Sequence, residues 1–261
     1  MFKLGNFSID EILFAVAQNS NDDILYSVDQ LSSASIEISA ESSDITDKKG
    51  NVVRTVYRSK SGIFNATNAF LHPQLMNAAS GSEIEKASAA AKIQMPKITV
   101  VEAGKTKDIS DAKEGTVKVI GMFGNGATAD AMTDAEIAAC IAGGIFTAPA
   151  AGEDLPIQYL VKYERDAEAG IKLVNDAESF PNLVKLTLSC SYVDPCSDEL
   201  KPCYVVLPRF MADPSMTISL DSESQEMDFN GILNIDYCGT TRALYYIYFP
   251  ETDEIVVPPS F

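Results

Sequence analysis

Residues 25–70 read LYSVDQLSSASIEISAESSDITDKKGNVVRTVYRSKSGIFNATNAF, and this stretch decides the fold class. Apolar and polar residues alternate along Ser35–Glu41, which is the period-two pattern of a β-strand with one face in water. Val52–Arg58 is a second strand candidate, and a polar connection, Ser42–Asn51, separates the two. The turn-forming residues of this connection are Asp44, Asp47, Gly50 and Asn51. The stretch therefore predicts a β-hairpin.

Further strand patterns follow along the chain. Val184–Tyr192 and Met216–Asp221 alternate in the same way, as strands with one wet face do. Val205–Leu207 and Ala243–Phe249 are more continuously apolar, which is typical of strands covered on both faces. Less regular strand candidates are Ile63–Phe70, Ile98–Val101, Thr116–Ile120 and Pro156–Tyr163. Together these patterns predict a mainly β fold.

Helix signals are fewer. His72–Ser80 has Pro73 in its first turn and a glycine directly after it, so it is a helix candidate. Ser82–Lys92 is rich in Ala, Glu and Lys, which also favours a helix. In Thr133–Ala142, Thr133 and a glutamate three residues later predict a capping box.

The Gly- and Ala-rich stretch Gly121–Gly152 interrupts the strand rhythm. No interdomain linker, fixed-period repeat or low-complexity tail accompanies it. We therefore expect a single β domain over residues 1–261, with an inserted decoration at about 121–182.

The net charge of −17 restricts the functions that fit this chain. Residues 131–261 hold 21 of the 37 acidic residues and only 7 of the 20 basic ones. Tight nucleic-acid binding needs Lys and Arg to displace counterions, so this composition disfavours it. No apolar run has the length of a membrane span or the basic start of a signal peptide, and we expect folding in a cytoplasm.

The residues for catalysis and metal binding are sparse. His72 is the one histidine, and its place at a helix start has a plain structural explanation. Cys190, Cys196 and Cys203 are spaced more widely than zinc knuckles, so we expect all five cysteines to be thiols, with no metal and no cofactor. The loop Gly124–Gly126 lacks the lysine or helix of a phosphate cradle.

Two parts of the chain resemble major tail tube proteins of long-tailed bacteriophages. In the N-terminal part the resemblance rests on VDQL at 28–31, DITDKKGNVV at 44–53 and SKSGIFNATNAF at 59–70. In the C-terminal part it rests on FPNLVKLTLSCSYVDPC at 180–196 and on the long stretch 205–251. These motifs are patterns of strands and turns, and they cover somewhat over half of the chain.

The resemblance implies two packed antiparallel sheets, as a sandwich or barrel, with one or two flanking helices. In that family six copies form a ring whose inner sheets join into one barrel, and rings stack through a long loop between early strands and through the termini. The tube conducts DNA without binding it specifically and performs no chemistry. The implied partners are copies of the chain itself and other tail proteins. The implied location is the virion tail, assembled in the host cytoplasm.

The segment Ser42–Arg58 occupies the place of the inter-ring loop. Its candidate contact residues are Asp44, Asp47, Lys48, Lys49, Gly50, Asn51, Arg54 and Arg58. A lumen that DNA passes should be net negative, and the polar faces of two strands are candidates for its wall. The first is Glu37 with Glu41; the second is Asp221, Glu223, Glu226 and Asp228. The alternative for these acids is an outer surface kept for solubility.

Other functions fit the same features. Another virion protein, such as a capsid decoration or a tail terminator, would also lack catalysis. A carboxylate-based hydrolase would need two acids that converge in a pocket. A secreted ligand-binding β domain would need an export signal.

Overall fold

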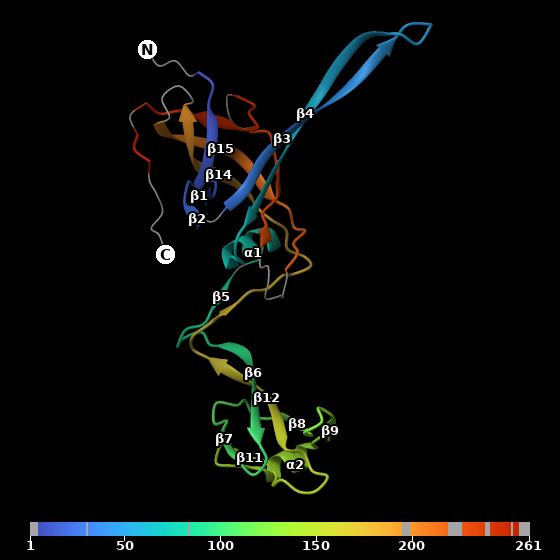
Figure 1. Cartoon of the computed structure of the whole chain (residues 1–261), viewed down its shortest axis with the longest axis vertical. Coiled ribbons are helices and arrows are strands. Elements are labelled where there is room, and N and C mark those ends of the chain that lie inside the picture. Colours follow the sequence, from blue (N-terminus) through green and yellow to red (C-terminus); the bar gives the residue numbers. More distant parts are fainter. Residues whose placement is uncertain are drawn as a thin grey trace. The chain divides into compact units, whose positions relative to one another are not determined.

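The computed structural model describes residues 5–29, 31–82, 84–194, 199–218, 226–237, 241–251 and 253–255. The chain forms two compact units (Figure 1). Unit 1 comprises Met1–Glu83 and Leu173–Phe261, and unit 2 is the intervening Ile84–Lys172. The compact inserted unit thus spans 84–172, whereas the sequence pattern led us to expect an insertion at about 121–182.

Unit 1 is built on one antiparallel sheet that curls into a half-barrel. Along the sheet the strands follow the order β3, β4, β17, β15, β14, β1, β2, because β4 pairs β3 on one side and β17 on the other. The short β16 also pairs β4, and β18 pairs β15. Their bounds are β1 Ser8–Gln18, β2 Ile24–Val28, β3 Leu31–Thr46, β4 Val52–Asn68, β14 Leu183–Asp194, β15 Glu199–Ala212, β16 Met227–Asp228, β17 Gly231–Leu233 and β18 Tyr246–Tyr248.

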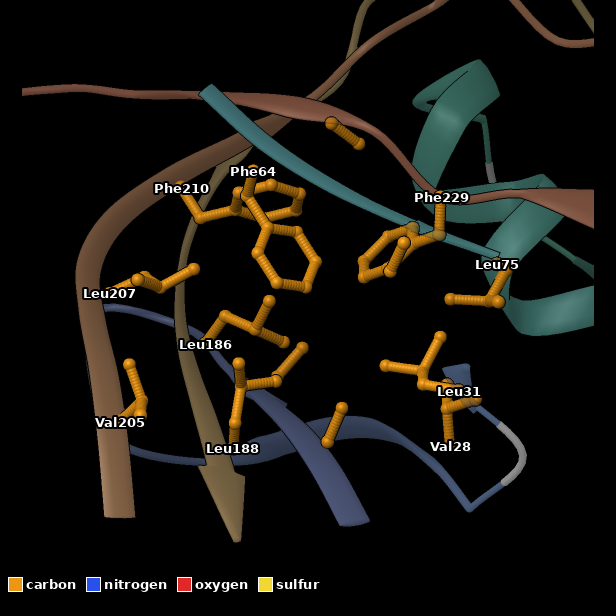
Figure 2. Packing of buried hydrophobic residues seen from close by; sticks show 14 of the residues in the cluster. Val28, Leu31, Phe64, Leu75, Leu186, Leu188, Val205, Leu207, Phe210 and Phe229 are labelled. Carbon is orange, nitrogen blue, oxygen red and sulfur yellow. The ribbon is translucent and has the colours of Figure 1, made fainter. Parts of the chain in front are cut away.

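The core of unit 1 lies on the inner face of this sheet. Phe64 of β4, Phe210 of β15 and Phe229 meet edge to face, with ring centroids 5.3 to 6.0 Å apart. Leu75 of the helix α1 (Pro73–Ser80) is fully buried in the same cluster (Figure 2). The alternating apolar residues of the strands therefore build one continuous core, with α1 covering one end of it.

Unit 2 has a smaller core of its own. Its main sheet has the strand order β6, β12, β8, β9. A three-stranded sheet, β10–β11–β7, and a two-stranded sheet, β5–β13, complete the unit's described strands. The buried residues include Phe146, Val161 and Tyr163, together with Ile137 of the short helix α2. Bounds in unit 2 are β5 Glu85–Lys86, β6 Ile93–Glu102, β7 Thr106–Asp108, β8 Lys118–Met122, β9 Thr128–Ala131, α2 Asp134–Ala139, β10 Ile141–Ala142, β11 Ile145–Thr147, β12 Gln158–Ala167 and β13 Ile171–Lys172.

The structure confirms the mainly β fold and two of the three predicted helices. α1 begins with Pro73 and ends at Gly81, whose φ of 71° is left-handed and where a Cβ atom would collide with the Phe180 carbonyl. In α2, Thr133 and Glu136 form the capping box.

One expectation about the elements is wrong, one falls partly outside the described residues, and one is confirmed only in part. Ser82–Lys92 is not a helix in its described residues: β5 pairs β13, and Ala87 donates its N–H to the Gly170 carbonyl. Tertiary hydrogen bonds thus replace those that a helix would supply. Residues 216–218 lie outside any strand, and the rest of the predicted strand at 216–221 lies outside the described residues. Only three residues of Ala243–Phe249 form a strand, β18.

Candidate assembly surface

A hairpin arm is the most distinctive feature of unit 1. We define the arm as residues 42–59, which lie in β3, in β4 and in the turn between them. Among the described residues, β3 and β4 pair here only with each other, because the other partners of β4 reach no further than residues 62–68. Figure 1 shows this two-stranded ribbon extending beyond the rest of its sheet.

The turn at the tip of the arm is organised by Asp47. Its Oδ1 accepts the backbone N–H of Lys49 at 2.8 Å and that of Asn51 at 2.9 Å, and its Oδ2 accepts the Asn51 side-chain amide at 3.0 Å. These bonds, the Asn51 side chain first, lower the pKa of Asp47 below its usual value. The contribution of the carboxylate is therefore complete near neutral pH and is lost as the pH falls through the lowered pKa. Gly50, with a φ of 86°, completes the turn.

The observed connection between the two strands is shorter than the sequence pattern predicted. β3 continues to Thr46, so the turn holds only residues 47–51. Asp44, expected in the turn, instead lies in β3 opposite Thr55 and accepts its hydroxyl hydrogen bond at 2.6 Å. The cross-strand bond compensates for the poor strand propensity of an aspartate.

The surface of the arm is both basic and apolar. Its exposed cations are Lys48, Lys49, Arg54 and Arg58, with Lys60 just beyond it. Within the described residues none of these five forms an ion pair. Four large apolar side chains are between 53% and 72% exposed: Ile45, Val52, Val53 and Tyr57. These four are not among the contact residues expected from the sequence, which placed Ile45 in the polar connection between the two strands and not opposite Arg54.

Such a ribbon has little to stabilise it alone. A two-stranded hairpin in water is marginal at best, and exposed apolar patches generally mark sites of protein contact. The exposed apolar side chains of the arm are therefore typical of a protein-contact surface.

The two lumen candidates lie beside the arm on β3. Glu37 and Glu41 are both exposed, and they alternate with Ile36, whose partner across the ladder is the buried Phe64. They therefore point away from the core. Asn65 donates a hydrogen bond to Glu37 at 3.4 Å. Of the second acidic group, Glu226 and Asp228 are exposed, while Asp221 and Glu223 lie outside the described residues.

Among the strands that the structure describes, the sheet of unit 1 has two open edges. β2 ends one side of the strand order, and Ile24 and Leu25 on it are exposed. β3 ends the other side, where β4 is its only hydrogen-bonded neighbour among the described strands. Open edges present unpaired backbone groups and are templates for pairing with another chain.

The part of the chain that the structure describes contains no cluster of three or more His, Cys, Asp or Glu side chains arranged to hold a metal ion. His72 directly precedes α1, and its side chain makes no capping hydrogen bond there. None of the described helices is long and apolar enough to cross a membrane.

Cys190 and Cys203 face each other across the β14–β15 ladder, and both are buried. They and Cys140 are free thiols, whereas Cys196 and Cys238 lie outside the described residues. The hydrogen bond that the Cys190 thiol donates to Cys203, together with burial, raises the pKa of Cys190, so Cys190 stays protonated and unreactive at neutral pH.

We expect all five cysteines to be reduced in freshly purified protein, because the two that face each other are held as buried thiols. Alkylation under denaturing, non-reducing conditions followed by mass spectrometry should find five labels per chain. A linked Cys196–Cys203 or Cys190–Cys203 pair would overturn this expectation.

A family model described as the YomU/Tube protein family matches residues 7–238, and the chain belongs to this family. The family is a phage-associated, tube-like family of structural proteins, which are not enzymes. No curated protein matches the chain.

Proposed function

We propose that this member of a tube protein family is the subunit of the tail tube of a long-tailed phage. In this proposal six copies form a ring, rings stack into a hollow tube, and the tube conducts DNA to the host. The single observation that carries the proposal beyond family membership is the arm, a hairpin whose large apolar side chains are more than half exposed and whose basic side chains form no ion pair among the described residues.

The two open sheet edges support ring closure. If β2 of one copy pairs with β3 of the next, every edge of the sheet is satisfied around a closed ring, and an aggregation hazard is removed. The sheets of neighbouring copies would then join into one barrel, with the core of each copy on its outside and the opposite face toward the lumen. The arm projects from the β3 edge and is the element available for contacts between rings.

The exposed carboxylates of β3 support a lumen that does not retain DNA. DNA carries one charge per roughly 1.7 Å of helix axis, so lysines repeated in every ring would act as a ladder of binding sites. We assign Glu37 and Glu41 to the lumen wall and unit 2 to the outside of the tube as a decoration.

Assembly without metal is the direct test of this proposal. Purified protein should sediment partly as high-mass species, and negative-stain microscopy should show long hollow cylinders of uniform width. Chelator should leave them intact, since they are held by strand pairing and by the arm. Protein that remains monomeric at high concentration, or that gives isolated rings or caps, would refute the tube and favour a decoration or terminator protein. One tightly held zinc per chain would refute assembly without metal.

A further inference from the structure

Unit 1 carries a large open groove that the sequence did not reveal. Its volume is ≈ 820 Å³, and β1 and β3 form much of its wall. Phe64, Leu188 and Val205 of the core lie at its base, and these residues are almost completely buried. Ile9, Ile38, Tyr245 and Ile247 also line it and remain 37% to 44% exposed. The groove is thus an apolar opening that reaches the core of the half-barrel.

The charged residues that line the groove are all acidic. Asp10, Glu11 and Asp29 line it, and none of the three forms an ion pair among the described residues. No lysine, arginine or histidine is among the described residues that line it. An occupant complementary to the groove is therefore apolar and positively charged.

The arm has this combination in a protein that is otherwise acidic. Its exposed apolar side chains, Ile45, Val52, Val53 and Tyr57, match the apolar walls. Its exposed cations, led by Lys48 and Lys49, match the three carboxylates. We propose that the groove is the acceptor site into which the arm of a second copy of this chain docks. This inference rests on the proposed function and adds the receiving surface to it.

The occupant has to come from another copy because arm and groove share one strand. Ile38 of β3 lines the groove, while Ile45 belongs to the arm on the same continuous strand. At about 3.3 Å per residue, the strand holds these two side chains about 23 Å apart. An arm from one copy in the groove of the next is a head-to-tail contact between unlike surfaces, and such a contact propagates as an open filament when the rotation between copies does not close. Stacked rings need a contact of this kind.

A charge exchange tests the docking. Asp10→Lys with Glu11→Lys should lower tube yield roughly tenfold or more at low salt, because cations would then face cations across a desolvated contact. Combining this pair with Lys48→Glu and Lys49→Glu should restore tubes, since the charges are again complementary. The matched control is Glu114→Lys with Asp130→Lys, two exposed acids of unit 2 that form no ion pair among the described residues, and it should assemble like wild type.

The outcomes separate this inference from the proposed function. If the arm variant fails to assemble while the groove variant forms normal tubes, the arm docks elsewhere and the inference is wrong, although the tube stands. If both pairs block assembly and their combination does not restore it, direct pairing is refuted. If the wild-type chain forms no tubes, the proposed function itself fails.

Crosslinking gives a second test that does not depend on the folding of the groove variants. p-Benzoylphenylalanine in place of Tyr57, which is 72% exposed, should leave the fold intact. After irradiation of assembled tubes, the crosslinks should map to residues 9–12 or 31–38 of another copy. Crosslinks confined to unit 2, to other arms or to a different protein would refute the assignment.

Discussion

Lys48→Glu combined with Lys49→Glu should reduce tube formation roughly tenfold or more at low salt, while the unassembled protein stays folded. Both lysines lie in the exposed turn of the arm, and neither forms an ion pair among the described residues. Their attraction to an acidic neighbour steers docking, and salt weakens such steering. Reversing both charges turns the attraction into repulsion from a protein of net charge −17.

Light scattering during assembly, followed by electron microscopy, would measure this effect. The control is Lys105→Glu with Lys107→Glu, two exposed lysines of unit 2 that form no ion pair among the described residues, and it should assemble at the wild-type rate. Circular dichroism should show the same folded state in both double variants. Normal tubes from the arm variant would show that the two lysines of the arm are not needed for ring stacking.

Phe64→Ala should lower the free energy of unfolding of the unassembled protein by about 3–5 kcal/mol. Phe64 is fully buried, and its ring contacts Phe210 and Phe229 edge to face at 5.8 and 6.0 Å. Truncation therefore loses transfer free energy, leaves a cavity and removes two aromatic pairs (Figure 2). Such a loss is a large share of the ~5–15 kcal/mol by which domains are stable.

Phe70→Ala supplies the matched control. Phe70 lies shortly after the same strand but is 63% exposed, so its truncation should change stability by less than about 0.5 kcal/mol. Urea unfolding followed by circular dichroism measures both. A cost below about 1 kcal/mol for Phe64→Ala would mean that the aromatic cluster does not hold unit 1 together.

Local signals made part of the fold predictable. The capping box at Thr133 and the Pro73–Gly81 pair act within one or two turns, so the sequence identified both helices. The helix predicted at Ser82–Lys92 was wrong because the helix propensity of Ala, Glu and Lys is a local property. The fold instead pairs β5 with a strand more than 80 residues away in the sequence. β1 escaped detection since the apolar run Ile12–Ala17 hides the period of Leu13, Ala15 and Ala17, which alone are buried.

The candidate site was predictable in the same unequal way. The arm and its cations follow from alternation and turn chemistry within residues 35–58. The groove could not be predicted, because β1, β3, β14, β15 and β18 build it together and no local pattern records where they meet. Asp10 and Glu11 therefore looked like ordinary surface acids in the sequence, and only the fold places them beside an apolar opening.

Electron cryomicroscopy of the wild-type protein after assembly tests the central claim most directly. The account predicts a hollow tube of stacked rings in which the sheet edges of β2 and β3 join neighbouring copies into a continuous barrel. Glu37 and Glu41 should line a net negative lumen, with the arm reaching from ring to ring. A specimen without tubes would contradict the account. The assignment of the lumen wall would be wrong if the lumen-facing residues sum to a positive charge, or if Glu37 and Glu41 both face outward.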